Sequence, residues 1–321
     1  MFEKVLVPLD GSEVSLGILP HVSYLAQRLD IPVVLALVVS PDDIEGSGEP
    51  TLTDRSGLPI ARSAVDPLDE AKGWIHRFAS QLGQKGILTE TMVATGDDPA
   101  EEILRLADQQ GCDFIAMATR DRNLLSQAFR GSVTNEVVRS ARVPVLAIAP
   151  EKSDIAPGQQ AALSRVIVPL DGSSFGEAVL PYVEDLARRL SLELVLLRIL
   201  QLENVYPPLG GTPMAADPGS AQVQAMAEEV TEEEITRYLE EVTARLARKG
   251  LNARWQMIRG VTPAHRVADL AREYPDNMIA LTSHGRSGVA RWVLGSAAEE
   301  LIRATGDPVL VIPSEVAEEA S

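Results

Sequence analysis

The chain alternates short apolar runs with longer amphipathic stretches, and the whole alternation occurs twice. The apolar runs are Lys4–Leu9, Pro32–Val39, Thr89–Val93, Phe114–Thr119, Val143–Ile148, Arg165–Leu170, Leu192–Leu200, Ala253–Ile258, Met278–Thr282 and Pro308–Ile312. Nearly continuous apolar runs of this length are typical of strands that helices cover on both faces. Because strands and helices alternate, we predict an α/β fold: two doubly wound, Rossmann-like domains in tandem, each with a five-stranded parallel sheet and right-handed crossovers.

The amphipathic stretches show helical periodicity and signals for where helices begin and end. One apolar stripe at i, i+3, i+4 and i+7 consists of Val183, Leu186, Ala187 and Leu190. Upstream of it, Ser174 and Glu177 have the spacing of a capping box, which predicts Ser174 as a helix N-cap. Further along, the acidic stretch Glu228–Glu234 and the basic residues just before Gly250 suit the two ends of a helix dipole, with the glycine as C-cap.

The second half repeats the first in register. Val7–Ser12 returns as Val168–Ser173. Further matches pair Leu19-Pro20 with Leu180-Pro181, Gly96 with Gly260, Pro99-Ala100 with Pro263-Ala264, Gly131-Ser132 with Gly295-Ser296, and Pro144–Leu146 with Pro308–Leu310. Matches that stay in register along a whole half indicate a duplication. The predicted organisation is a domain at 1–150 with a long loop at 41–67, a polar linker at 151–163, a domain at 164–314 with a long loop at 202–221, and an acidic, frayed tail at 315–321.

Composition narrows the possible environments and partners. The chain has 321 residues, of which 45% are apolar and 23% charged, as in ordinary globular proteins. The formal net charge of −17 would repel a phosphate backbone, so nucleic acid is not an expected partner. The single cysteine, Cys112, suits a reducing cytoplasm. No charged leader precedes an apolar run, and no run approaches the roughly 20 residues that span a bilayer, so we expect a soluble, cytoplasmic protein without membrane contact.

Candidate chemistry lies at the ends of the predicted strands. Ligands of doubly wound sheets bind outside the carboxyl ends of the strands, near the point where the strand order reverses. That rule places Asp10–Ser12 and Asp171–Ser173 at a candidate cleft in each half. In the second half Thr282–Gly288 follows the fourth strand, and Gly295-Ser296 opens a helix. Glycine lets backbone approach a ligand and a helix start favours an anion, which predicts a phosphate cradle. An ordinary loop with a helix cap would use the same residue types.

At these residues the chain resembles the universal stress protein family in its tandem two-domain form. The nucleotide signature of that family is Gly, two residues, Gly, nine residues, then Gly followed by Ser or Thr. Nine residues separate Gly285 from Gly295-Ser296, so this spacing fits. The departure is Thr282, which stands where the pattern has its first glycine and could crowd the ribose or the phosphates.

The resemblance implies ATP or AMP as ligand, with or without Mg²⁺. It implies that Pro169 and Asp171 hold adenine and ribose and that Ile199 lies against the base. The phosphates would then be contacted by Gly285, Gly295, Ser296 and the amide of Ala297. In the first half Pro8, Asp10 and Val38 match the base-side positions, but both leading glycines are gone and a carboxylate, Asp121, would repel a triphosphate. We therefore predict a degenerate first copy with weak or no nucleotide binding.

Three functions remain to be weighed. The leading one is a nucleotide-binding regulatory protein of the stress response, in which ligand state alters conformation or an unknown protein partner. A slow ATPase is the second, although no dedicated base lies near the cradle, so we expect no enzyme and assign no catalytic residue. A nucleotide-free scaffold is the third. The sequence has no P-loop, CxxC or HExxH motif, which argues against a P-loop enzyme and a zinc site.

Two apolar segments predict how the halves meet. Val143–Ile148 and Val309–Ile312 are candidate edge strands, and unpaired apolar edges are a liability. Since relatives of this family usually dimerise through such edges, we expect the two segments to meet in a pseudo-twofold pair within the chain. A homodimer of two chains is a further possibility. The histidines His21, His76 and His265 lie on predicted helices without partners at metal-ligand spacing, so structural roles are expected for them.

Overall fold

The computed structural model describes most of both halves. The described residues are 1–41, 66–119, 133–150, 153, 161–201, 232–260, 262–274, 276–283 and 296–313. Nearly all of the predicted loop at 41–67, the whole of the loop at 202–221, most of the linker and the acidic tail lie outside this set.

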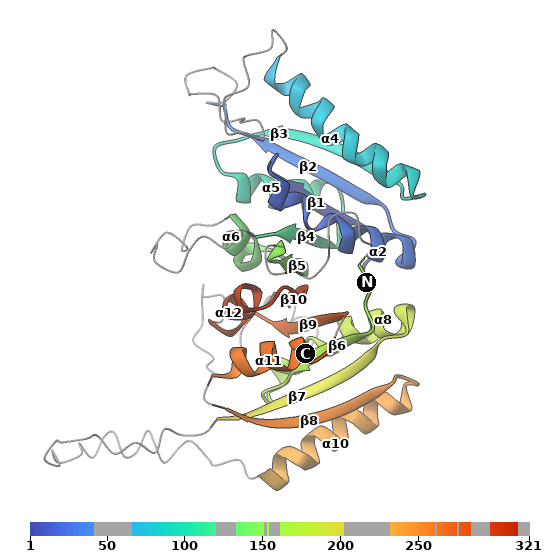
Figure 1. The fold of residues 1–321 in the computed structure, drawn as a ribbon, viewed down its shortest axis with the longest axis vertical. Coiled ribbons are helices and arrows are strands. Elements are labelled where there is room, and N and C mark those ends of the chain that lie inside the picture. Colours follow the sequence, from blue (N-terminus) through green and yellow to red (C-terminus); the bar gives the residue numbers. More distant parts are fainter. Residues whose placement is uncertain are drawn as a thin grey trace, which may run out of the picture.

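Helices and strands alternate in both halves, as the apolar pattern predicts (Figure 1). The first half comprises β1 (Val5–Leu9), α1 (Glu13–Leu16), α2 (Leu19–Leu29), β2 (Val33–Val39), α4 (Pro67–Gln84), β3 (Thr89–Thr95), α5 (Pro99–Gln109), β4 (Phe114–Ala118), α6 (Val133–Ser140) and β5 (Val145–Ile148). The second half comprises β6 (Arg165–Pro169), α7 (Ser174–Glu177), α8 (Leu180–Leu190), β7 (Glu193–Gln201), α10 (Glu232–Arg248), β8 (Ala253–Gly260), α11 (Pro263–Arg272), β9 (Asn277–Thr282), α12 (Ser296–Ala304) and β10 (Val309–Ile312).

Each half is a five-stranded parallel sheet whose strand order reverses beside its first strand. The order is β3-β2-β1-β4-β5 in the first half and β8-β7-β6-β9-β10 in the second. Neighbouring strands within each half are parallel. The predicted fold class is confirmed, and the switch points lie between β1 and β4 and between β6 and β9.

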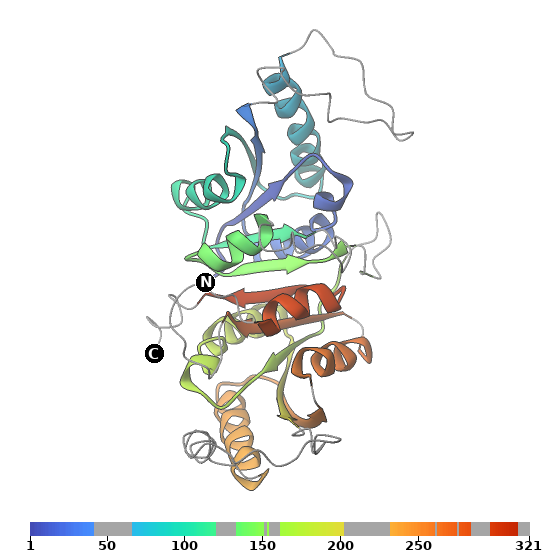
Figure 2. The same ribbon diagram turned by 90° about the vertical axis from the view of Figure 1, so that its left-hand side faces the viewer.

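The two sheets join edge to edge into one ten-stranded sheet. β5 and β10 are antiparallel, with Leu146 opposite Leu310 and Ala147 opposite Val309. Figure 2 shows the two strands side by side at the middle of the molecule, β5 in green and β10 in red. The expected pairing of these apolar edges within one chain is therefore present, and it covers the backbone groups that each half would otherwise leave open. A homodimer stays a prediction.

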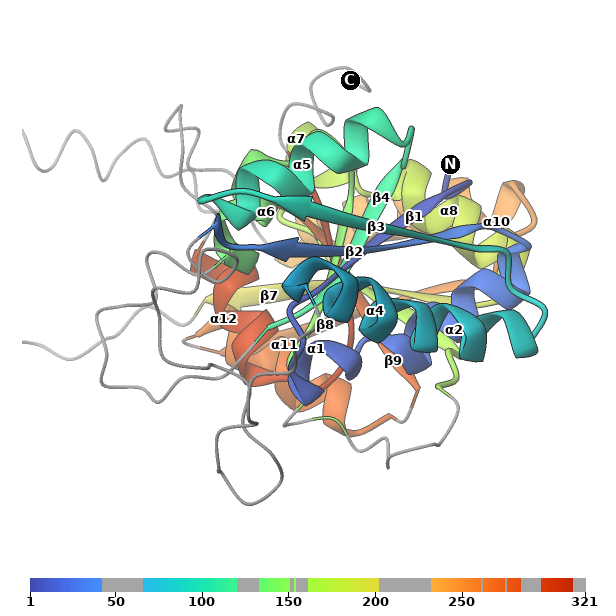
Figure 3. The ribbon, with the colours of Figure 1, turned by 90° about the horizontal axis from the view of Figure 1, so that it is seen from above.

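Two apolar layers cover the two faces of the sheet. Along each strand successive residues alternate between them, so Val5 and Val7 belong to one layer and Leu6 to the other. One layer includes residues of α2, α4, α8 and α10, and we call it the α10 face. The other includes residues of α5, α6, α11 and α12, and we call it the α12 face. Figure 3 shows the same division in the first half, with α2 and α4 on one side of the strands and α5 and α6 on the other.

The N-terminus of α7 corrects one prediction. Ser173, rather than Ser174, is the N-cap, and its Oγ accepts a hydrogen bond from the Gly176 N–H at 2.9 Å. The predicted capping box is wrong, because Glu177 then falls outside the third helical position and instead pairs with Arg245. Both serines suit a cap by type, and the turn that precedes them brings Ser173 into that place. The end of α10 agrees with prediction: Gly250, just beyond the helix, has a φ of +79°.

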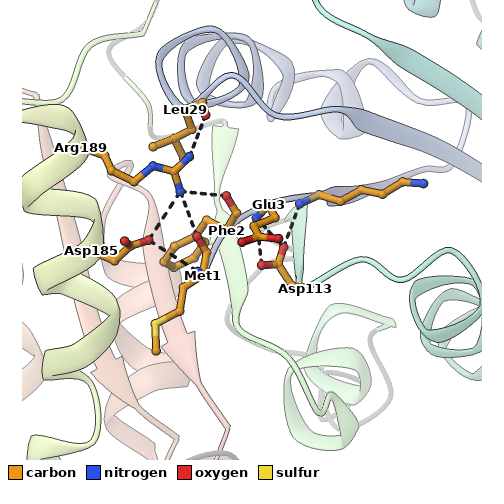
Figure 4. Close-up of polar contacts among 8 residues, drawn as sticks. Met1, Phe2, Glu3, Leu29, Asp113, Asp185 and Arg189 are labelled. Carbon is orange, nitrogen blue, oxygen red and sulfur yellow. Dashed lines mark hydrogen bonds and ion pairs between the residues drawn. The ribbon is translucent and has the colours of Figure 1, made fainter.

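A single arginine ties the second half to the start of the first (Figure 4). Arg189, in the last turn of α8, donates to the carbonyls of Met1 at 2.9 Å, Phe2 at 3.1 Å and Leu29 at 2.7 Å. Asp185, one turn earlier on α8, lies 3.5 Å from the same guanidinium. The equivalent arginine of the first half, Arg28, instead lies 5.8 Å from the ring of Tyr24. The contact between the two halves, which we call the seam, is therefore not symmetric.

Candidate functional site

The structure brings four of the predicted site residues to the carboxyl ends of three neighbouring strands in the second sheet. Pro169 ends β6, Asp171 follows it, Ile199 lies near the end of β7, and Thr282 ends β9. These three strands are neighbours, and β6 stands between the other two at the switch point. Ile199 packs against the α12 face, and alternation along β6 places Pro169 on the same face as Ile167. The two base-side residues that the resemblance implies therefore share a face.

The phosphate-side residues are described only in part. Ser296 and Ala297 are the first two residues of α12, so the amides there belong to a helix N-terminus, as predicted. Gly285 and Gly295 lie outside the described residues, as does Asp121 of the first half.

Thr282 lies on the opposite face of the sheet from Ile199. Ala280 belongs to the α10 face and Leu281 to the α12 face, so alternation along β9 directs Thr282 toward the α10 face. Its side chain is buried, and the next residue, Ser283, donates its N–H to the Ile312 carbonyl at 2.8 Å. Thr282 therefore does not compete with Ile199 for space on the base side.

Asp171 sits in a turn that also occurs in the first half. Its Oδ1 accepts from the Ser173 N–H at 3.0 Å and from the Ser173 hydroxyl at 2.6 Å. In the first half the Asp10 Oδ1 accepts from the Ser12 N–H at 3.0 Å and from its hydroxyl at 2.5 Å. The glycine between them has a φ of about +80° in both copies, which a side chain would strain. The carboxylate thus has a folding role in both halves.

The two carboxylates nevertheless differ in their surroundings. Asp10 is exposed, whereas Asp171 is half-buried. A Cβ built on Gly176 would lie 2.6 Å from the Asp171 Oδ1, so this oxygen occupies space that a side chain would need. The first half has Ser15 at the equivalent position, and its hydroxyl donates to the Ser12 carbonyl at 2.8 Å. The Ser15 hydroxyl also accepts from the Asp10 N–H at 3.3 Å, so a side chain contacts Asp10 at the position where the second half has the glycine beside Asp171.

A polar set on the α10 face is the part of the site that sequence reasoning missed. We define the polar set as Glu177 of α7 with Tyr238 and Arg245 of α10. Glu177 and Arg245 form an ion pair. Burial, together with the nearby carboxylates of Glu177 and Asp171, raises the pKa of Tyr238. A further cation, Arg198 on β7, donates to the Leu170 carbonyl at 3.1 Å, directly before Asp171.

The first half is apolar at two of the three positions that correspond to the polar set. Gly86 and Gly250 end their helices with the same φ of +79°, which fixes the correspondence between α4 and α10. At this offset Tyr238 corresponds to Trp74, and Arg245 to Gln81. Glu177, the last residue of α7, corresponds to Leu16, the last residue of α1. Trp74 and Leu16 both pack against the apolar core. A residue-by-residue comparison of the two copies along these helices could have found the set from the sequence.

The remaining candidates have structural explanations. His21, His76 and His265 lie on α2, α4 and α11 as predicted, and His265 lies 2.9 Å from Glu300. Burial raises the pKa of the Cys112 thiol to about 11, which keeps it protonated at neutral pH. Across the described ranges no group of three or more His, Cys, Asp or Glu side chains is arranged to hold a metal ion. In the same part of the chain, no helix has the length and apolar character needed to cross a bilayer.

Comparisons with known proteins cover both halves. A universal stress protein of Methanocaldococcus jannaschii, MJ0531, is 29% identical over 154 residues, which is 48% of this chain and 86% of that protein. A universal stress protein structure from Archaeoglobus fulgidus covers 97% of both chains with a TM-score of 0.66 at 20% identity, which shows a shared fold. A universal stress protein solved in complex with cAMP matches 46% of this chain, and 98% of its own, with a TM-score of 0.34 at 20% identity.

The family model of universal stress proteins matches residues 1–149 and again residues 163–313. Together these matches take in nearly the whole chain, and each one contains a complete five-stranded half. The chain belongs to the universal stress protein family and contains the family's domain twice.

Proposed function

We propose that the second half binds an adenine nucleotide, ATP or AMP, and that the nucleotide state alters the conformation or the protein partners of the chain. The observation that supports this most is the convergence of Pro169, Asp171 and Ile199 at the switch point of the second sheet. Doubly wound sheets bind their ligands at this place.

Each residue has a chemical role in this proposal. Asp171 is a half-buried carboxylate and accepts hydrogen bonds from ribose hydroxyls. Pro169 and Ile199 offer the base an apolar surface on the α12 face. The amides of Ser296 and Ala297 at the start of α12 attract the phosphates, with Gly285 and Gly295 completing the cradle. Mg²⁺ is commonly held by one or two carboxylates together with phosphate oxygens, so Asp171 and a bound nucleotide suit that ion.

We further propose a binding protein of the cytoplasm rather than an enzyme. Hydrolysis of a phosphoanhydride needs an oriented water and a base or a metal-assisted equivalent. At the described strand ends of the second half, the carboxylate that faces the site, Asp171, already accepts two hydrogen bonds from Ser173. Phosphate release over many turnovers, well above that of heat-inactivated protein, would contradict this part of the proposal.

The proposed function is tested first by what the protein retains on purification. Freshly purified protein is denatured without added nucleotide, and the supernatant is identified by ion-exchange chromatography and mass spectrometry. We expect close to one ATP or AMP per chain, because one half is degenerate. Two per chain would contradict the asymmetry.

A matched pair of variants follows. Gly295→Asp places a carboxylate in the phosphate cradle, whereas Gly131→Asp makes the same change at the equivalent position of the first half. By calorimetric titration with ATP, the first variant is expected to lose measurable affinity, because like charges repel in a poorly solvated cleft. The second is expected to bind like the parent. Equal affinity in all three proteins would favour a nucleotide-free scaffold or a different site.

A further inference from the structure

The pairing of β5 with β10 has a pseudo-twofold axis at its centre. Leu146 lies opposite Leu310, and the repeat of Pro144–Leu146 as Pro308–Leu310 shows that these two leucines are equivalent. The pairs to either side of them are apolar as well. Two β10 strands from two copies of the chain would also place apolar residues opposite apolar residues in this register. The strands alone therefore do not determine which edge pairs with which.

One polar contact lies close to the same axis, between α6 and α12. Nδ2 of Asn135 on α6 donates to Oε1 of Glu299 on α12 at 3.4 Å. Asn135 and Glu299 are equivalent in the repeat, because they follow the equivalent glycines Gly131 and Gly295 at the same spacing. Figure 1 shows the two helices on either side of β5 and β10. Since equivalent residues that touch lie at the axis, two halves of the same kind would bring two identical residues together here.

The residue at the axis differs in charge between the halves. Glu299 is half-buried, and its Oε1 also accepts from Arg303, one turn later on α12, at 2.8 Å. Against Asn135 this oxygen receives an amide donor, which makes a charge-assisted hydrogen bond. Against a second Glu299 it would face another acceptor of the same charge, with no hydrogen between them. Arg189, by contrast, donates across the seam to backbone carbonyls, which either half can offer.

We propose that Asn135 and Glu299 determine the pairing of the seam: Glu299 accepts the α6 side of a first half and rejects the second half of another copy of this chain. The partner that fits beside Glu299 is a helix with an uncharged hydrogen-bond donor at the axis. The β10 edge is thereby kept for a first half, so several chains can assemble only through another surface or by exchanging whole halves. The inference concerns the seam and does not depend on nucleotide binding.

Two single variants reproduce the like pairs within the intact chain. Asn135→Glu places carboxylate against carboxylate, as two second halves would, whereas Glu299→Asn places amide against amide, as two first halves would. Opening of the seam is measured by hydrogen exchange and mass spectrometry on the amides of β5 and β10. We expect exchange about tenfold faster than in the parent for Asn135→Glu, the value of one hydrogen bond to a charged group. For Glu299→Asn we expect less than about threefold, because two amides can still donate and accept.

The exchanged pair separates the seam contact from effects within each helix. Asn135→Glu combined with Glu299→Asn moves the carboxylate to α6, where Arg139 stands at the position that corresponds to Arg303. We expect the β5 and β10 amides of this double variant to exchange within about twofold of the parent. Glu300→Asn is the matched control, because Glu300 is a carboxylate of the same turn of α12 that contacts His265 on α11. It should leave exchange at the seam unchanged.

Three outcomes would overturn the proposal. Parent-like exchange in Asn135→Glu would show that a like pair is tolerated at the axis. Losses that simply add in the double variant would assign the role of Glu299 to its own helix, and equal losses in Glu299→Asn and Glu300→Asn would assign it to the charge of α12. If Asn135→Glu is poorly folded by thermal unfolding, Asn135→Asp takes its place, with faster exchange expected alone and parent-like exchange in combination with Glu299→Asn.

Discussion

The two halves share the turn after their first strand almost atom for atom, yet they differ in what lies beneath it. In both, an aspartate accepts from the backbone and the hydroxyl of a serine two residues later. In the first half Leu16 of α1 and Trp74 of α4 are partly buried and pack against the apolar core. At the equivalent positions of the second half, Glu177 and Tyr238 belong to the polar set, which includes an ion pair and a buried phenol.

This difference helps to distinguish residues that the fold requires from residues that a ligand would require. The turn is present wherever the chain must leave the first strand and enter a helix, so its aspartate alone is weak evidence of binding. A polar contact between helices is different, because an apolar contact of similar size would cost less to bury. Among the described residues only the second half has one there, which agrees with the proposal that this half binds the nucleotide.

Replacing the two aspartates, one in each of two variants, should give the largest difference in ATP affinity between the halves. Asp171→Ala should lower ATP affinity by about 10–100-fold, because a hydrogen bond to a charged group contributes about 1.5–3 kcal/mol. Asp10→Ala should leave ATP affinity unchanged. Both variants lose the same turn, so their melting temperatures should fall by similar amounts, and that match is the control. Calorimetric titration with ATP and thermal unfolding measure the two effects, and equal losses of affinity would contradict the asymmetry.

The seam offers a second contrast of smaller size. Arg189→Met removes three hydrogen bonds from one guanidinium to carbonyls of the first half and should destabilise the chain by about 2 kcal/mol. Arg28→Met removes a cation–π contact with Tyr24 and should cost about 0.5 kcal/mol. Urea unfolding of the full chain measures both. Similar losses of unfolding free energy in the two variants would mean that the hydrogen bonds of Arg189 contribute little to the stability of the contact between the halves.

Much of this asymmetric molecule could be predicted from its sequence, because the strongest signals are periodic or duplicated. Apolar runs of strand length located the strands. The pairing of Val143–Ile148 with Val309–Ile312 was expected from the family resemblance together with the need to cover apolar edges. The repeated Asp-Gly-Ser placed one aspartate at each switch point. These features depend on patterns that any packed α/β sheet must satisfy.

Three details were not predictable in the same way. Ser173 and Ser174 are both suitable caps, and only the geometry of the turn selects the first. Thr282 lies on the face opposite Ile199, and spacing along a motif does not say which face of the sheet a side chain takes. That Thr282 crowds the ribose or the phosphates stays a prediction. Comparing the two copies marks Tyr238 as a polar residue at a position that is apolar in the first half, but a single polar residue on a helix is usually assigned to solvent, and the burial of Tyr238 comes from tertiary contacts. Tertiary contacts decide all three.

The smallest of the expected effects concerns pH and another pair of equivalent positions. His21 on α2 corresponds to Tyr182 on α8. Burial lowers the pKa of His21 from 6.5 to about 4, and its Nδ1 has no hydrogen-bond partner among the described residues. The unfolded chain therefore binds this proton more readily than the folded one. The stability contributed by the neutral imidazole is complete above pH 6.5 and is lost as the pH falls from 6.5 toward 4.

By pH 5.5 the loss should reach about 1.4 kcal/mol relative to neutral pH, since one pH unit below the unfolded pKa is worth that much per proton. His21→Phe removes the titrating group and should flatten this part of the profile, whereas Tyr182→Phe, at the equivalent position, should leave the slope as it is in the parent. Urea unfolding at half-unit steps between pH 7 and pH 5 measures the slope. An unchanged slope in His21→Phe would mean that other groups cause the acid sensitivity. The helices α2 and α8 would then not differ in their response to pH.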